Sequence, residues 1–302
     1  MKTLRKISAA LLAAALLALA AGCAKGNASG PIKIATKPMT EQYILGEMLG
    51  LLIENSTDYK VEITKGVGGG TSNIQPAMEK GEFDLYPEYT SSGWVMVLGN
   101  SPEGVTDEEM FAQLKAQYEE KYNMTWVGLY GFNNTFTVAV RGEAARQYGL
   151  EKTSDLTAVA GELNFGGNPD YIEREDGFGK LCEAYGLSFK SVSDIDIGLK
   201  YQALASGDID VTNAFTTDAQ LANADVVTLE DDLHLQVNYF CSTVVRRDTL
   251  EKYPGLEEAL MKMDGILSDG EMAQLNYKVE VEGADEKQTA RDFLVEKGLL
   301  EG

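Results

Sequence analysis

Hydrophobic and polar positions alternate along this chain with two different periods, one typical of β-strands and one typical of amphipathic helices. This pattern predicts short strands separated by amphipathic helices. Residues 32–36 predict a strand, and Thr40 is placed to cap a helix over residues 41–55. The same alternation continues through a second round that begins at residues 135–140, whereas residues 249–300 predict three or four helices with little strand character. Strands that alternate with helices predict parallel, doubly wound sheets. The apolar face expected for the first helix consists of Ile44, Leu45, Met48, Leu49 and Leu52.

Further elements are expected between these landmarks. Residues 67–70 predict a turn, and Thr71 is placed to cap the helix that follows it. Strands are expected at residues 60–64, 83–86 and 125–127, and helices at residues 71–80 and 107–122.

An internal repeat is the most informative feature of the pattern. Residues 77–90 align without gaps on residues 203–216, at a constant shift of 126 residues. Both segments predict a helix end, a glycine turn, a strand and then an aromatic–threonine pair. Because open α/β sheets bind ligands at the carboxyl ends of their strands, Tyr89 and Phe215 are expected to face each other across a cleft.

A weaker echo of the repeat relates residues 32–38 to residues 163–169, each a strand followed by a loop with proline at the same step. Together the two matches predict two lobes of like topology. One lobe is expected to comprise residues 31–134 completed by residues 241–302, and the other residues 135–240. Two crossings between lobes would make a hinge that closes on a ligand.

The first residues of the chain carry an export signal. Three basic residues precede an apolar run over residues 7–21, which ends in small residues immediately before Cys23. This is the shape of a secretory signal, and with its cysteine it resembles a bacterial lipoprotein lipobox. The resemblance implies a cleaved signal peptide over residues 1–22, acylation of Cys23, and a lipid-anchored linker over residues 23–30. An uncleaved anchor helix is the alternative, and either way the remainder lies outside the cytoplasm.

Composition narrows the class of protein. The chain has 302 residues, of which 44% are hydrophobic, and a net charge of −21. Phosphates would repel so acidic a protein, which makes nucleic acid a poor partner. The length beyond the linker suits two lobes. Apart from Cys23 there are two cysteines, Cys182 and Cys241; two buried thiols are favoured, but an exported protein can also pair them.

The sequence contains few residues that could form a catalytic site. The single histidine, His234, lies in an acidic segment, and no metal-spaced histidine–cysteine cluster exists. Residues 67–71 contain three glycines but lack the Gly-Lys-Ser/Thr ending of a phosphate loop, and are better explained as a turn and helix cap. No cofactor is therefore expected, and an enzyme is a distant alternative.

Several segments together resemble one family, the glycine betaine/carnitine/choline-binding proteins of ABC importers, from about residue 31 to the C-terminus. The resemblance implies a two-lobed periplasmic-binding-protein-like (type II) α/β fold, each lobe a doubly wound sheet flanked by helices. It also implies extracytoplasmic capture of a quaternary-ammonium osmolyte, for osmoprotection, and delivery to a membrane permease with its ATPase. The matching segments are IATKPMTEQ (34–42), GEFDLYPEYT (81–90), GFNNTF (131–136), REDG (174–177), DVTNAFTTD (210–218) and Asn238-Tyr239.

The resemblance further implies an aromatic cage for the ammonium group. A permanent cation without N–H groups cannot be held by hydrogen bonds, but aromatic faces attract it with about 0.5–2 kcal/mol per ring. Phenylalanine at two of the positions keeps the quadrupole and loses the hydroxyl. The cage positions that match are Tyr89, Phe136, Phe215 and Tyr239.

The resemblance places the polar end of the ligand near Lys37, Ser92 and Arg174. Two cations suit a carboxylate, which favours a zwitterion (glycine betaine, proline betaine or carnitine) over choline. The alternative for both cations is salt bridging with the abundant acids, and for Arg174 the two interpretations weigh equally. A binding protein for an amino acid or another small zwitterion is the alternative function.

Overall fold

The computed structural model describes residues 30–173, 177–196 and 199–302. Residues from Ile32 to Gly302 form one compact unit. Within the described ranges, no helix combines the length and apolar character that a membrane span requires. Cys23 and Arg174 lie outside the described residues.

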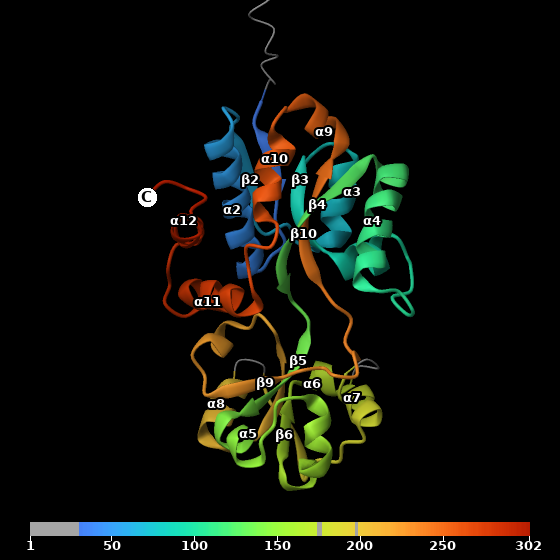
Figure 1. Ribbon diagram of the computed structural model, residues 1–302, viewed down its shortest axis with the longest axis vertical. Helices are drawn as coiled ribbons and strands as arrows, with labels where there is room; N and C mark the ends of the chain where they lie inside the picture. Colours follow the sequence, from blue (N-terminus) through green and yellow to red (C-terminus); the bar gives the residue numbers. More distant parts are fainter. Residues whose placement is uncertain (1–29, 174–176, 197–198) are drawn as a thin grey trace, which may run out of the picture. The chain divides into compact units, whose positions relative to one another are not determined.

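Two five-stranded sheets form the framework of this unit, and the chain passes between them twice (Figure 1). The strand order of the first sheet is β2-β1-β3-β10-β4, and that of the second is β7-β6-β8-β5-β9. The first sheet contains β1 (Ile32–Ala35), β2 (Val61–Thr64), β3 (Leu85–Tyr89), β4 (Met124–Asn133) and β10 (Phe240–Arg246). The second contains β5 (Phe136–Arg141), β6 (Asn164–Gly167), β7 (Ser191–Asp194), β8 (Val211–Phe215) and β9 (Val226–Leu229).

The strand registers agree with both parts of the sequence repeat. In the first sheet Ile34 of β1 pairs in parallel with Leu85 of β3. In the second sheet Phe165 of β6 pairs in parallel with Val211 of β8. Each pair occupies the positions that the two matched segments make equivalent, so the two sheets repeat one strand arrangement.

The aspartates of the repeat have the same local role in both sheets. The Asp84 carboxylate accepts a hydrogen bond from the backbone N–H of Lys33 at 2.8 Å, and the Asp210 carboxylate accepts one from Asn164 at 3.0 Å. Each aspartate thus links the start of its own strand, β3 or β8, to the neighbouring parallel strand, β1 or β6.

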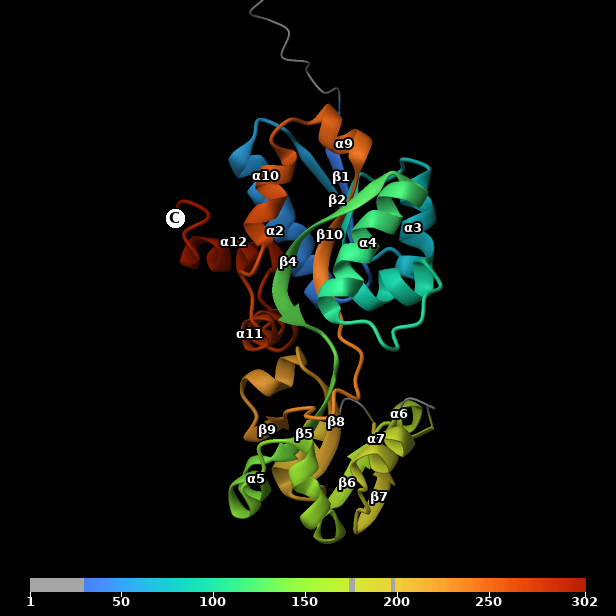
Figure 2. The same cartoon turned by 45° about the vertical axis from the view of Figure 1, so that its right-hand side comes forward.

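The sheets differ from the expected all-parallel arrangement because each contains a strand of opposite direction. β10 runs antiparallel to β3 and β4, and β5 runs antiparallel to β8 and β9. Both strands follow a crossing, as Figure 2 shows for β4 leading into β5. The chain therefore enters each sheet at the end where β3 or β8 finishes, and has to run the other way.

Helices cover both sheets, and most agree with the expected elements. Helix 107–122 has the expected bounds, but the first helix begins at Thr40 itself, with Met39 as N-cap and no side-chain cap. Strand β3 extends to Tyr89, beyond the expected end at residue 86. The α-helices are α2 (Thr40–Ser56), α3 (Thr71–Glu79), α4 (Asp107–Tyr122), α5 (Gly142–Tyr148), α6 (Pro169–Glu173), α7 (Phe178–Tyr185), α8 (Lys200–Ser206), α9 (Arg247–Lys252), α10 (Leu256–Leu260), α11 (Asp269–Glu280) and α12 (Glu286–Glu296). The shorter helical segments are η1 (Ser92–Val97), η2 (Thr153–Ala158), η3 (Ala160–Glu162), η4 (Ala219–Ala222) and η5 (Met261–Met263).

Helix α2 is held unusually close to the first sheet, which positions its N-terminus beside the strand ends. A Cβ atom at Gly46 would lie 2.5 Å from the Cγ2 atom of Thr36, so a larger residue would push the helix outward. Helices α10, α11 and α12 also contact α2. The expected apolar face of α2 is confirmed, because all five of its side chains are fully buried: Ile44, Leu45, Met48, Leu49 and Leu52.

The two later cysteines are unpaired. Cys241 is buried in β10 and Cys182 is half-buried on α7. Burial raises the pKa of the Cys182 thiol to about 11, so this thiol stays protonated at neutral pH.

Candidate functional site

Tyr89 is the last residue of β3, and its ring is buried with 5% of its surface exposed. The hydroxyl donates a hydrogen bond to the carboxylate of Glu41 and lies 3.7 Å from the Sδ atom of Met39. Burial raises the pKa of Tyr89 well above its usual value, so the hydroxyl remains a donor. The hydrogen bond of its hydroxyl group therefore fixes the Tyr89 ring at the end of the strand.

Glu41 lies in the first turn of α2 and is 3% exposed. Besides the Tyr89 hydroxyl, its carboxylate accepts the Nδ2 of Asn134 at 3.0 Å and the Nδ2 of Asn276 at 3.5 Å, and Thr217 adds a further side-chain hydrogen bond. Burial raises the pKa of Glu41 above its ordinary 4.5, although these donors and the positive end of the helix dipole oppose the shift. The donors come from four separate parts of the chain, so Glu41 links these parts by hydrogen bonds.

Lys37 follows β1 and forms a buried ion pair with Glu88 of β3. Glu88 is fully buried and also accepts hydrogen bonds from the Thr71 hydroxyl at 2.7 Å and the Tyr89 backbone N–H at 2.6 Å. The Nζ of Lys37 lies 4.6 Å from the centroid of the Tyr89 ring. The charge of Lys37 is therefore already balanced by Glu88, and one face of the tyrosine already carries a cation.

Phe136 and Phe215 are cross-strand partners at the ends of β5 and β8. Their rings stack with centroids 4.6 Å apart, and Tyr171 of α6 adds a third ring with its centroid 5.3 Å from that of Phe136. Two of the four expected cage rings are thus in direct contact, with an unexpected tyrosine next to them.

A second buried lysine lies behind Phe215. The Nζ of Lys200, 3% exposed, is 2.8 Å from Asp218 Oδ2. The same carboxylate oxygen accepts the Tyr201 hydroxyl at 2.8 Å and the Phe215 backbone N–H at 3.2 Å. Asp218 thereby ties helix α8 to the end of β8.

Tyr239 and Ser92 lie where the second crossing re-enters the first sheet. The backbone N–H of Tyr239 donates to Asn133 Oδ1 at 2.7 Å, and its carbonyl accepts the Asn134 N–H at 3.2 Å. Ser92 begins η1 and is buried, and its neighbour Ser91 donates to the Asn238 carbonyl at 2.5 Å. The loop after Tyr89 and the segment before β10 are therefore joined, which brings these two expected positions into one region.

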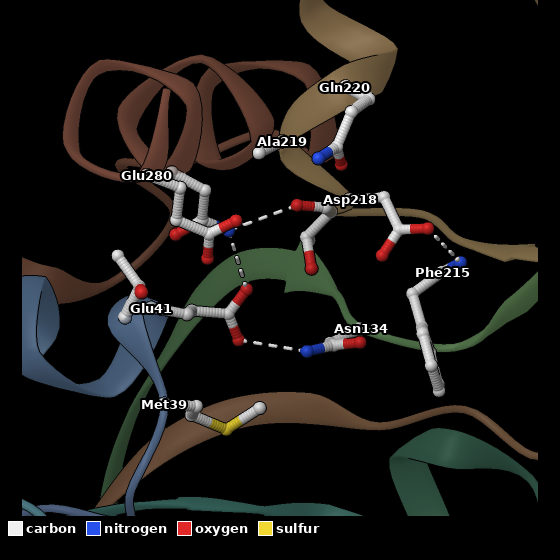
Figure 3. A pocket seen from close by; sticks show the side chains of 11 residues that line it. Met39, Glu41, Asn134, Phe215, Asp218, Ala219, Gln220 and Glu280 are labelled. Atoms are coloured by element: carbon white, nitrogen blue, oxygen red, sulfur yellow. Dashed lines mark hydrogen bonds between the residues drawn. The ribbon is translucent and has the colours of Figure 1, made fainter. Parts of the chain in front are cut away.

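Several of these groups line a pocket with a volume of about 160 Å³ (Figure 3). Glu41 and Asn134 line it from one side, and Phe215 and Asp218 from another. Tyr89 contacts the pocket through Glu41. The remaining lining residues are Met39, Thr40, Thr217, Ala219, Gln220, Asn276 and Glu280.

The expectations from sequence missed the carboxylates and amides of this site. A glutamate in the first turn of a helix is usually a solvated residue that favours the helix dipole, so Glu41 gave no signal by type or spacing. Asn276 did give such a signal, because it is a polar residue one helical turn from buried Met272, on the apolar face of α11. Tyr171 could be found only from the stacked phenylalanines, which tertiary packing brings to it.

Comparison with known proteins relates the chain to one transport family. Residues 30–296 match the substrate binding domain of ABC-type glycine betaine transport systems. The ergothioneine transport permease/ergothioneine binding protein EgtU of Helicobacter pylori (strain G27) is 42% identical over 269 residues, which covers 89% of this chain and 48% of EgtU. The chain thus spans about half the length of that relative.

Two further relatives match along most of their length. The carnitine transport binding protein OpuCC of Listeria monocytogenes is 33% identical over 280 residues, covering 92% of this chain and 90% of OpuCC. The crystal structure of a glycine betaine/carnitine/choline ABC transporter superposes with a TM-score of 0.84 at 29% identity, covering 89% of this chain and all of that one.

Proposed function

Because the chain belongs to the family of substrate-binding domains of ABC-type glycine betaine transport systems, we propose that it captures a quaternary-ammonium zwitterion outside the cytoplasm and delivers it to a membrane permease with its ATPase. One observation carries this proposal. Aromatic residues stand at the equivalent ends of β3 and β8, Phe215 lines a pocket at the end of β8, and Tyr89 bonds to Glu41, which lines the same pocket.

The ammonium group is proposed to lie among Tyr89, Phe136, Phe215 and Tyr239. The stacked pair Phe136–Phe215 presents a rigid apolar wall, and the Tyr89 ring is held by its hydroxyl. Rings fixed before the ligand arrives lose little conformational freedom on binding, which makes each contact more effective.

The carboxylate of the ligand is proposed to lie towards Ser92 and Arg174. Lys37 was expected to share this task, but its ion pair with Glu88 means that it would have to leave one carboxylate for another. Arg174→Ala is therefore expected to weaken binding of glycine betaine more than binding of choline, because only the betaine carries the anion. Equal losses would assign the arginine to structural salt bridging.

The chemical class of the ligand follows from the relatives' names together with this site. Carnitine and ergothioneine, for which OpuCC and EgtU are named, are both trimethylammonium carboxylates, as is glycine betaine. Isothermal titration calorimetry with glycine betaine, carnitine, ergothioneine, choline and free amino acids tests the proposal. Tightest binding of a quaternary-ammonium zwitterion supports it, tightest binding of choline would contradict the zwitterion, and tightest binding of an amino acid would move the chain to another solute class.

Closure of two lobes around the ligand is part of the proposal. The lobes would comprise residues 31–134 with 241–302, and residues 135–240, with the two crossings acting as the hinge. Small-angle scattering should give a smaller radius of gyration when the tightest-binding compound of the panel is added. An unchanged radius would contradict closure.

Attachment of the protein to the outer face of the membrane by a lipid at Cys23 is proposed from the leader sequence alone. Cells that express the chain should incorporate labelled palmitate into it, and Cys23→Ala should abolish the label and release the protein from the membrane. Absence of label in the wild type would contradict the lipid anchor without affecting the ligand.

A further inference from the structure

Glu41 differs from the other buried carboxylates of the described residues in having no cationic partner. Four glutamate or aspartate residues in the described ranges are less than a tenth exposed. Three of them form ion pairs, Glu47 with Lys65, Glu88 with Lys37 and Asp210 with Arg141. For Glu41, 3% exposed, the hydrogen-bond donors are all neutral side chains: Tyr89, Asn134, Thr217 and Asn276.

Such an arrangement is costly in the absence of a cation. Removing a carboxylate from water costs several kcal/mol, and neutral donors recover only part of that cost. The raised pKa of Glu41 has the same origin, since burial disfavours the charged form. A cation bound in the adjoining pocket would offset this cost.

The pocket next to Glu41 is suited to a positive group. Its described lining residues include two more carboxylates, Asp218 and Glu280, and none is a lysine, arginine or histidine. The Oδ1 atom of Asn276, which belongs to another lining residue, has no hydrogen-bond partner among the described residues. Because Asp218 is already paired with Lys200, the unpaired negative charge among the described lining residues belongs to Glu41 and Glu280, with Phe215 as the aromatic wall (Figure 3).

We propose that Glu41 is the counter-ion of the ligand's quaternary ammonium group. The inference rests on the proposed function and adds a direct charge contact to the aromatic cage. The hydroxyl of Tyr89 bonds to Glu41 and Phe215 lines the same pocket, so a cation between these two rings lies beside the carboxylate. Opposite charges in a water-poor site attract more strongly than a cation and a ring.

The first test removes the charge and keeps the shape. Calorimetry of Glu41→Gln with glycine betaine, carnitine, ergothioneine and choline should show a loss of about tenfold or more in affinity for whichever of these the wild type binds. Glu47→Gln is the matched control, because it neutralises another buried glutamate of the same helix whose partner is Lys65. It should leave affinity unchanged within twofold.

A second test needs no variant, and decides the matter if Glu41→Gln does not fold. A permanent cation beside Glu41 must lower its raised pKa, so binding of that same compound at mildly acidic pH should release protons, seen as binding heats that depend on the ionisation enthalpy of the buffer. At pH well above the pKa of Glu41 the release should vanish. The other charged or titratable groups around this site are Lys37, Glu88, Tyr89, Lys200, Tyr201, Asp218, Cys241 and Glu280.

The outcomes separate this inference from the proposed function. Reduced affinity of a folded Glu41→Gln, or proton release by the wild type if that variant does not fold, supports Glu41 as counter-ion. Wild-type affinity in Glu41→Gln, or no proton release where that variant does not fold, overturns the inference and leaves the family's cage in place. A wild type that binds none of the four quaternary amines would overturn the proposed function, and the inference with it.

Discussion

The ends of β3 and β8 hold their aromatic residues by the same kind of backbone contact. In each, the backbone N–H of the aromatic donates to a carboxylate that is paired with a buried lysine: Tyr89 to Glu88, and Phe215 to Asp218. A buried ion pair orients its neighbours strongly because breaking it leaves an unpaired charge. The two strand ends thus hold the backbone of the aromatic residue in the same way, although Glu88 aligns with Ala214 in the repeat and Asp218 lies beyond it.

The side chains at the two ends are held by different forces. Tyr89 is fixed through its hydroxyl to Glu41, whereas Phe215 is fixed by stacking on Phe136, which in turn contacts Tyr171. One end thus offers negative charge with an aromatic ring, and the other offers aromatic surface. The side chains at these two equivalent strand ends therefore form two different walls. An ammonium group between them would meet charge on one side and ring faces on the other.

The largest effect is expected from breaking the buried ion pairs. Glu88→Gln leaves Lys37 charged and unpaired in a site where Glu88 is fully buried, and should lower the free energy of unfolding by about 3 kcal/mol or more. Asp218→Asn should cost less, because the Nζ of Lys200 keeps a hydrogen bond to the Asn213 carbonyl at 3.1 Å, and because 21% of the Asp218 side chain is exposed, which weakens the ion pair that is lost. Urea unfolding measures both. Equal losses would mean that burial does not distinguish the two strand ends.

Removal of the rings should test binding on both walls. Tyr89→Ala and Phe215→Ala should each weaken binding of the compound selected by calorimetry by about tenfold or more, through lost cation–π energy and lost contact. Phe215→Ala also exposes one face of Phe136, so the loss of affinity in this variant should be at least as large as that in Tyr89→Ala. A double variant that bound with wild-type affinity would place the ligand elsewhere.

A smaller effect is expected from exchanging the two ring types. Phe215→Tyr should leave affinity nearly unchanged, because the ring face is kept. Tyr89→Phe removes one donor to Glu41 and should lower the free energy of unfolding by about 1 kcal/mol. Denaturant unfolding and calorimetry of the two variants side by side would check this. A larger stability loss in Phe215→Tyr would contradict the assignment of polar and apolar walls.

The smallest effect expected is a pH dependence of the ligand-free protein. The pKa of Glu41 is raised above its ordinary value of 4.5 in the folded state, so its contribution to stability is fully present below pH 4.5 and is lost as the pH rises through the folded pKa. Glu41→Gln should gain stability relative to the wild type over that interval, measured by urea unfolding at successive pH values. A difference that does not change with pH would indicate that Glu41 carries no raised pKa.

The α/β character, the apolar face of α2 and the duplication of the strand ends were all readable in the sequence. These features depend on local periodicity and on a repeat that keeps its register, as the pairs Ile34–Leu85 and Phe165–Val211 show. The direction of β5 and β10 was not readable, because it depends on where the chain crosses between the sheets. Local pattern carries no record of that crossing.

The aromatic positions Tyr89 and Phe215 followed from the repeat, since an aromatic–threonine pair at two equivalent strand ends marks one location in both sheets. The charges around them did not follow. Lys37 meets Glu88 across two parallel strands, and Glu41 gathers donors from residues as distant in sequence as Asn276. Burial and charge pairing are properties of the packed unit, so only the tertiary structure decided which lysine was already neutralised and which carboxylate was left without a partner among the described residues.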